Sequence, residues 1–415
     1  MHRTAQLAAL LTAGLWVLGC GGAHAPTTSS TTTAAPPPAP SGPAFGITED
    51  NAELLWAPSA AAPPSAAAFL TGRKELSALR PRYYRLLIDW AELQPSRSAP
   101  ADLERPVDGC ARGVPPCGSY RGVAGELEAI ASQQRAARER NEDEPQVVID
   151  ILGVPSWAVL PPHGCEAPGT PATARAVRAD ALPAYKALIS QLIALGRHKG
   201  VALPLWTPWN EPNNPRFLAP QRESCAASAR PLATEAYAGL ARAMAAQLEA
   251  SGTGAHMLLG ELGGYLRGST HRLALDEFVQ ALPADVPCLA RDWSIHVYAA
   301  YGRRAPGSEE APVAELERAL DARGGCARDA RVWVTEAGAG APRPGRPRAA
   351  TAAEEAGAQG ALSRQLAEWS ADPRVAAVFQ YSFREDPSYP VGLVDPSLRR
   401  LYGTYATWSA FSHQH

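Results

Sequence analysis

Two glutamates in the sequence end apolar runs of the kind that form buried strands. Glu211 follows Asn210 in the run Trp-Thr-Pro-Trp-Asn-Glu-Pro-Asn at 206–213, and Glu336 ends the run Val-Trp-Val-Thr-Glu at 332–336. If both runs are parallel strands of one barrel, their carboxyl ends lie at the same mouth. The sequence therefore predicts two carboxyl groups that face one another across a shared opening.

A facing pair of carboxyl groups suits the cleavage of a glycosidic bond. The glycosidic oxygen leaves poorly unless it is protonated, and the oxocarbenium-like carbon needs a nucleophile or a water molecule on its other face. One carboxyl must then start neutral and the other ionised, so their surroundings must separate the two pKa values. Arg85, in an apolar run at 83–90, is the candidate cation beside the ionised group. Any one of Glu211, Glu336 and Arg85 alone could be a solvated surface residue. The placement of all three on predicted strands favours an active site.

The elements that would position these residues are eight short apolar runs separated by Ala- and Leu-rich stretches. The predicted strands are 44–48, 83–90, 146–152, 203–209, 257–261, 293–298, 331–336 and 376–383, and the predicted helices include 182–195, 234–249, 273–282, 313–322 and 353–370. Such alternation indicates parallel strands with crossover helices. Because no Gly-x-Gly-x-x-Gly follows the first run, the pattern favours a closed (β/α)8 TIM barrel, a single domain over 44–415, over a dinucleotide-binding fold.

Several motifs together resemble the retaining glycoside hydrolases of clan A. The Asn-Glu-Pro at 210–212 is the mark of that clan. The sequences Gly-Val-Pro-Ser-Trp-Ala at 153–158, Ser-Ile-His-Val-Tyr at 294–298 and Thr-Glu-Ala-Gly at 335–338 resemble family 39 and the cellulase-like family 5. The resemblance covers essentially the whole barrel. It implies a glycosidase that hydrolyses O-glycosyl bonds in an extracellular oligo- or polysaccharide, without a cofactor.

The resemblance also implies roles for individual residues. Glu211 would be the general acid/base and Glu336 the nucleophile, at the ends of the fourth and seventh strands. Asn210 would hydrogen-bond the 2-hydroxyl of the sugar next to the scissile bond. Tyr298 would orient Glu336, and Arg85 would keep it ionised. A metal-dependent barrel hydrolase is disfavoured because no His-x-His follows the first strand.

The resemblance further implies that His296 lines the subsite of the cleaved sugar. A strand histidine is more often a core residue, but the His-x-Tyr spacing puts His296 and Tyr298 on one face of the strand. Trp157 and Trp209 fall near strand ends, as does Trp90, where flat rings can stack on pyranose faces. Core packing is the alternative for any single tryptophan. We expect Trp157 and Trp209 to contact substrate.

Three further acids and one substitution in the pattern leave the substrate open. Glu261, Asp89 and Asp150 lie on predicted strands, where they could contact sugar hydroxyls or bridge within the barrel. The clan often carries a tryptophan beneath the sugar at the end of strand eight, whereas the run at 378–384 has none. We interpret this difference as altered specificity on the same fold.

The first residues resemble a bacterial lipoprotein signal peptide. An apolar run at 7–18 is too short to span a bilayer comfortably, and Leu-Gly-Cys follows at 18–20. We expect a signal peptide over 1–19, lipidation of Cys20 and a disordered Thr/Ser/Ala/Pro tether over 20–43. The protein would then be lipid-anchored to a membrane of the bacterial cell envelope, on its extracytoplasmic side. An ordinary cleaved signal peptide, with Cys20 incidental, is the alternative.

Six cysteines remain, an even number in a chain that we expect to be exported: Cys110, Cys117, Cys165, Cys225, Cys288 and Cys326. Disulfides persist in exported proteins, so three bridges are expected. Fifteen pairings are possible for six thiols. Sequential pairing is the hypothesis, because each consecutive pair falls in one loop or beside adjacent strands. A metal site is a poor alternative, since no Cys-x-x-Cys or close Cys/His set occurs.

Composition limits the remaining classes of function. A hydrophobic content of 46%, a charged content of 19% and a formal net charge of −2 suit a globular enzyme and give no electrostatic reason to expect nucleic acid as a partner. Two alternatives keep the same barrel. One is a catalytically inactive, carbohydrate-binding lipoprotein, and the other is a transglycosylase that uses the same carboxyl pair.

Overall fold

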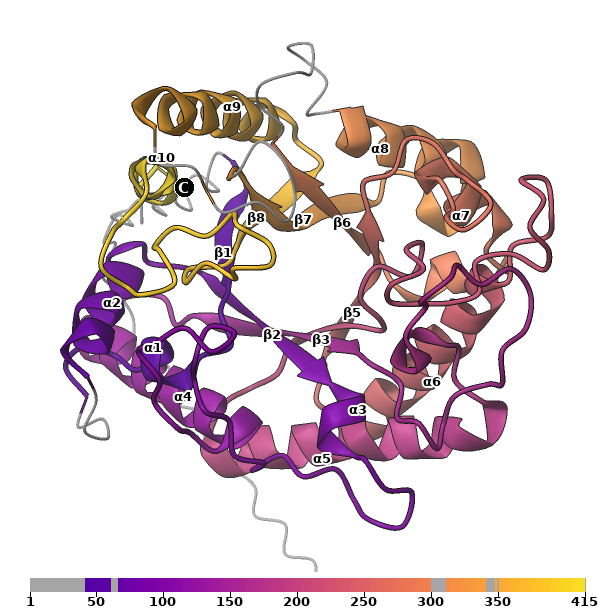
Figure 1. Ribbon diagram of the computed structural model, residues 1–415, viewed down its shortest axis with the longest axis horizontal. Coiled ribbons are helices and arrows are strands. Elements are labelled where there is room, and N and C mark those ends of the chain that lie inside the picture. The colour runs from indigo at the N-terminus through magenta and orange to yellow at the C-terminus, as the bar shows by residue number, and fades with distance from the viewer. Residues whose placement is uncertain (1–41, 61–65, 300–310, 341–347, 349–350, 415) are drawn as a thin grey trace, which may run out of the picture. The chain divides into compact units, whose positions relative to one another are not determined.

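The computed structural model describes residues 42–60, 66–299, 311–340, 348 and 351–414. Within them, eight parallel strands close into a barrel in chain order, and helices surround it (Figure 1). The predicted (β/α)8 barrel is confirmed. The predicted signal peptide, Cys20 and nearly all of the predicted tether lie outside the described residues.

All eight predicted runs coincide with strands of the barrel. The strands are β1 (Ala44–Thr48), β2 (Tyr83–Asp89), β3 (Gln146–Leu152), β4 (Leu205–Thr207), β5 (His256–Gly263), β6 (Asp292–Tyr298), β7 (Arg331–Gly338) and β8 (Val375–Tyr381). The largest difference is in β4, which is shorter than the predicted run 203–209. Pro204 and Pro208 flank it, and proline has no N–H to donate to a neighbouring strand.

Helices follow most strands along the chain. They are α1 (Ala52–Leu55), α2 (Ala67–Ala78), α3 (Trp90–Leu93), α4 (Gly122–Glu139), α5 (Leu182–Lys199), α6 (Ala233–Ser251), α7 (Leu275–Ala281), α8 (Ala311–Arg323), α9 (Ala352–Ala371) and α10 (Gly403–Ser412), with short 3-10 helices at Ala172–Ala174, Ala179–Ala181, Val286–Leu289 and Gly325–Ala327. Their ends carry the usual signals: Thr351 and Glu354 form a capping box before α9, and Gly200 ends α5 at a φ of 71°. Among the described residues, no helix combines the length and the apolar character needed to cross a bilayer.

The barrel interior is built in layers because side chains alternate along each strand. Its apolar layer is a separate cluster from the larger core between strands and helices, and it comprises Val148, Leu205, Leu258, Trp333, Ala377 and Phe379. Gly46 on β1 makes room for Phe379, since a Cβ at position 46 would lie 2.4 Å from that ring.

Two residues farther along these strands, toward the mouth, the interior becomes polar. Residues at these positions include Arg85, Asp150, Thr207, Thr335 and Tyr381. A polar layer thus rests on an apolar floor, as a barrel needs if chemistry is to occur at its mouth.

Disulfides join the six described cysteines in sequential pairs, which confirms the predicted connectivity. Cys110–Cys117 closes a short loop between α3 and α4. Cys288–Cys326 connects the segments that precede β6 and β7, at the end of the barrel opposite the mouth. The third pair, Cys165–Cys225, lies in the loops after β3 and β4.

Candidate active site

Arg85 is the centre of a buried ionic network at the mouth of the barrel. Its Nη1 donates to Glu336 Oε1 and its Nη2 to Asp150 Oδ2, both over 2.8 Å. Nη2 also donates to Asn210 Oδ1 over 3.1 Å, and Nε donates to Glu261 Oε1 over 3.4 Å. Burial lowers the pKa of this fully buried arginine, but the surrounding carboxylates outweigh burial and raise it well above its ordinary value. Arg85 therefore stays cationic and ties four strands together.

His296 lies between the two predicted catalytic carboxyl groups. Its Nδ1 is 3.0 Å from Glu211 Oε1 and 3.3 Å from Glu336 Oε2, and its Nε2 is hydrogen-bonded to Glu261 Oε2. Burial lowers the pKa of His296, but Glu336 and Glu261 outweigh it and raise the pKa to about 10. One carboxylate oxygen of Glu211 and one of Glu336 lie within 4.8 Å of one another beside this imidazole.

Glu211 is held at the entrance in an uncommon backbone conformation. Its φ of 37° lies in the left-handed region, where residues with a Cβ are rare and tend to mark functional sites. Asn214 donates a side-chain hydrogen bond to Glu211 Oε2. The glutamate side chain keeps 13% of its surface exposed, so it remains accessible from the cavity.

Glu336 has a donor at each of its oxygens. Arg85 donates to Oε1, and the hydroxyl of Tyr298 donates to Oε2. Burial and the nearby Glu336 raise the pKa of Tyr298 well above its ordinary value, so its hydroxyl remains a donor. Both oxygens of Glu336 act as acceptors, which is the hydrogen-bonding pattern of a carboxylate.

Two buried acids that the sequence singled out without a role lie beneath Glu211 and Glu336. Glu261 has a φ of 51° and accepts a 2.6 Å hydrogen bond from Thr335. Burial raises its pKa, but Arg85 and His296 outweigh burial and lower it to about 2. Asp150 instead has a pKa raised to about 8, because burial outweighs the effect of Arg85. Glu261 is therefore the carboxylate that fixes the charge beneath His296.

A cavity of about 850 Å³ opens above this network. Among the predicted site residues, Asn210, Glu211, Tyr298 and Glu336 line it, while Arg85 and His296 are buried beneath them. A cavity of this size is large enough for a small-molecule ligand beside both carboxyl groups.

The tryptophans do not line this cavity, which corrects part of the sequence interpretation. Trp209 is fully buried and its indole donates to the carbonyl of Phe217. Trp90 is fully buried as well, in α3. Trp157 is half-buried, donates to the carbonyl of Gln94 and contacts Trp90 edge to face. Trp209 therefore packs in the core and offers no face for a sugar.

Tyrosines supply the aromatic surface instead. Tyr381 ends β8, where the clan often has tryptophan, and it lines the cavity with Tyr298, Tyr389 and Tyr265. The rings of Tyr298 and Tyr389 lie 4.8 Å apart in an edge-on contact. The sequence did not reveal Tyr265 and Tyr389, because both belong to loops without a periodic pattern.

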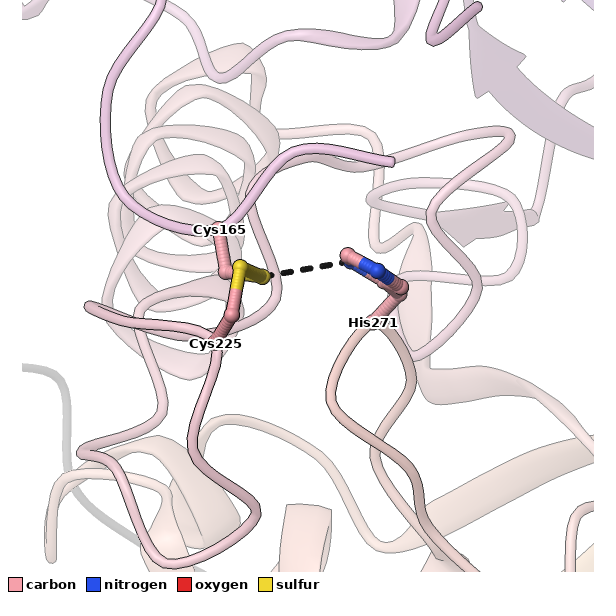
Figure 2. Close-up of side chains that lie close together, drawn as sticks. All are labelled: Cys165, Cys225 and His271. Carbon is pink, nitrogen blue, oxygen red and sulfur yellow. Dashed lines mark hydrogen bonds between the residues drawn. A yellow bond between two sulfur atoms is a disulfide. The ribbon is translucent and has the colours of Figure 1, made fainter. Parts of the chain in front are cut away.

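The Cys165–Cys225 disulfide connects the loops after β3 and β4, and it lies next to His271, which lines the cavity. Figure 2 shows Cys165 and Cys225 bonded to one another with the ring of His271 facing the sulfur of Cys165, and the Sγ to Nδ1 distance is 3.3 Å. These three residues lie close enough to hold a metal ion, as do Glu211, His296 and Glu336. Sulfurs joined in a disulfide are not thiolate ligands, and Arg85 already occupies one oxygen of Glu336.

Comparisons with known proteins find the same barrel fold in solved structures. No protein-family model matches the sequence, and no curated protein matches it. Solved structures do match: SrfJ from Salmonella typhimurium (TM-score 0.55, 12% identity, 89% of this chain and 74% of that chain), the endo-β1,6-glucanase BT3312 (0.53, 13%, 89% and 75%) and GH5_18 from Streptomyces cattleya in complex with GlcNAc (0.53, 15%, 90% and 80%). The chain shares its fold with glycoside hydrolases. Identities this low show the fold alone, so any assignment of an activity has to be argued from the residues of the site.

Proposed function

We propose that this chain is a retaining O-glycoside hydrolase. The proposal depends on the relation of Glu211 to Glu336: one carboxylate oxygen of Glu211 lies within 4.8 Å of one carboxylate oxygen of Glu336. Retaining enzymes hold their two carboxyl groups about 5 to 5.5 Å apart, whereas inverting enzymes need roughly 6.5 to 9.5 Å to admit a water molecule. The observed spacing favours direct attack by one carboxylate.

The contacts of each glutamate support one role each. Glu336, fixed by Arg85 and Tyr298, is the nucleophile: its oxygen bonds to the anomeric carbon while the bond to the leaving oxygen breaks. Glu211 gives its proton to that leaving oxygen. In the second step Glu211 takes a proton from water, whose oxygen attacks the anomeric carbon and releases Glu336.

Carbohydrate as the substrate class has support from the fold comparison. One solved structure with this fold is an endo-β1,6-glucanase, and another holds GlcNAc. The cavity beside the carboxyl pair, with four tyrosines in its wall, is suited to sugar rings. We propose an oligo- or polysaccharide as the substrate.

Proton NMR of the first product is the decisive experiment. The wild-type chain is incubated with a panel of oligosaccharides and aryl glycosides, and the anomer released from any cleaved substrate is recorded before mutarotation. A retained anomer is expected, whereas an inverted anomer contradicts the role of Glu336. A chain that binds members of the panel and cleaves none supports the inactive, sugar-binding alternative.

Azide rescue separates the two glutamates. Glu336→Ala with azide should give a glycosyl azide of inverted configuration, because the anion replaces the nucleophile. Glu211→Ala should still release activated leaving groups in the first step and, with azide, give a product of retained configuration. Identical behaviour of the two variants contradicts the assignment.

We also propose that the protein is exported and anchored by a lipid at Cys20. The motif at 18–20 supports this, as do the disulfides of the barrel, which persist in oxidising compartments. Fractionation of cells that express the full chain tests the anchor: Cys20→Ala should move the protein out of the membrane fraction. An unchanged distribution, or an N-terminus without lipid mass, contradicts the proposal.

A further inference from the structure

The wall of the cavity beside Glu211 carries an excess of positive charge. Arg216 lies in the loop after β4, five positions beyond Glu211, and Arg272 lies in the loop after β5. Both line the same cavity as Glu211. Within the part of the chain that the structure describes, neither guanidinium forms an ion pair with a carboxylate.

The other arginines around the site differ in this respect. Arg85 contacts three carboxylates, Arg222 pairs with Glu277, and Arg112, on the opposite wall of the cavity, pairs with Asp386. Their charges are already balanced within the protein. Among the described residues, the unpaired positive charge therefore lies on the wall formed by the loops after β4 and β5.

Arg272 lies in the wall of the cavity, where two contacts hold its guanidinium group. Its guanidinium carbon lies 4.2 Å from the centre of the Tyr265 ring, and Nη2 donates to the carbonyl of Arg267. Its Nε is buried and has no hydrogen-bond partner among the described residues. A buried donor without a partner costs free energy, and a ligand that supplies an acceptor recovers it.

Arg216 and Arg272 both lie close to the part of the cavity next to Glu211. Burial and Glu211 raise the pKa of Tyr265, while Arg272 and Arg216 lower it, so all three charged groups surround the same phenol. Tyr265 also lines the cavity. In the proposed mechanism Glu211 protonates the leaving oxygen, so the sugar that leaves occupies this side of the cavity, away from Glu336.

We propose that Arg216 and Arg272 bind an anionic group on the leaving-group side of the substrate, so that the substrate is an acidic glycan. This inference rests on the proposed glycosidase function and names its substrate class. The planar guanidinium suits both a carboxylate and a sulfate ester, since either presents paired oxygens to its fork of donors. The anion is thus a uronic acid carboxylate or a sulfate on the leaving sugar.

Binding to matched glycans tests the proposal without requiring turnover. An array presents oligosaccharides of several backbones, each in a neutral form, a form oxidised to the uronate at C6 and a 6-O-sulfated form. The wild-type chain should bind at least one anionic form about tenfold more tightly than its neutral counterpart at fixed ionic strength. The preferred form distinguishes carboxylate from sulfate. The inference is overturned if no anionic form binds more tightly than its neutral counterpart.

Single substitutions test whether Arg216 and Arg272 cause the preference for anionic glycans. Arg216→Gln and Arg272→Gln should each remove most of the preference, a loss of about five- to tenfold. Arg216 is exposed, so its variant should fold even if Arg272→Gln does not. Arg267→Gln is the matched control, because it removes one positive charge from the loop that carries Arg272 but lies outside the cavity lining. An equal loss in all three variants indicates a general surface potential and overturns the inference.

Turnover of the same panel separates this inference from the proposed function. Cleavage of neutral and anionic glycans alike, unaffected by both arginine variants, leaves the glycosidase assignment intact and overturns the anion site. Arginine-dependent binding of an anionic glycan that is never cleaved supports the anion site and contradicts the glycosidase assignment.

Discussion

The Nε2 of His296 is hydrogen-bonded to Glu261, so the opposite nitrogen of the same ring faces Glu211 at 3.0 Å. This arrangement lets His296 and Glu211 share one proton. The negative charge of Glu261 helps to retain that proton, because it contributes to the raised pKa of His296.

Glu261→Gln should therefore move the alkaline limb of the pH profile. Without the charge beneath it, the His296 imidazole loses its proton at lower pH, and the alkaline limb of kcat/KM should shift down by about one pH unit. Glu53→Gln, which disrupts a buried ion pair with Arg73 outside the cavity, is the control for lost stability. An unchanged alkaline limb in Glu261→Gln would show that the acid has only a structural role.

Tyr298→Phe should impair catalysis with little effect on folding. It removes the hydroxyl donor to Glu336, and hydrogen bonds to charged groups are worth about 1.5–3 kcal/mol, so kcat/KM should fall roughly 10- to 100-fold. Tyr405→Phe provides a matched control, because that hydroxyl also donates to a glutamate, Glu75, but far from the cavity. Steady-state kinetics with equal losses in both variants would argue against a specific role for Tyr298.

Two disulfides should differ in their effect on activity. Replacing Cys165 and Cys225 by serine frees the loops after β3 and β4, and the second loop carries Glu211. The free energy of unfolding should fall by about 2–4 kcal/mol, and kcat/KM should fall as well. Replacing Cys288 and Cys326 should lower stability similarly but leave kcat/KM unchanged, because that bridge lies at the other end of the barrel. Denaturant unfolding and kinetics on both double variants check this difference.

Stability should decrease as the pH rises above neutrality. His296 has a folded-state pKa raised from 6.5 to about 10, so its contribution is fully present below 6.5 and is lost as the pH rises through 10. Asp150 acts in the same direction, since its folded-state pKa is raised from 3.8 to about 8 and the folded state holds the proton more tightly. Melting temperatures of the wild type should fall between pH 6.5 and 10, and His296→Asn should show a shallower fall. Parallel curves would contradict the raised pKa of His296.

The barrel was predictable because its strands carry their signal locally. Eight apolar runs between helical stretches suffice, and even the ends of most strands follow from them. The length of β4 depends instead on two prolines within the predicted run 203–209. The two candidate catalytic residues could be predicted for the same reason, because Glu211 and Glu336 lie where apolar runs end.

Side-chain contacts and the roles of loop residues were harder to predict from the sequence. The sequence placed Trp209 near a strand end, but only the folded chain shows that its ring turns into the core. Arg216, Arg272 and Tyr265 come from loops whose paths depend on tertiary contacts and not on periodicity. Glu261 was noticed as an acid, but its position beneath His296 depends on a positive φ and a shift of register between β5 and β6.

Arg85 and Glu336 are 251 positions apart in the chain, yet they share a hydrogen bond inside the closed barrel. No fragment that contains only one of them holds the ionic network, so a half-barrel has no chemistry of its own. The ionic network thus requires a closed barrel, in which β8 pairs with β1. Two inactive fragments divided in a loop between β4 and β5 would regain function only by reassociation, which makes this barrel a natural split reporter.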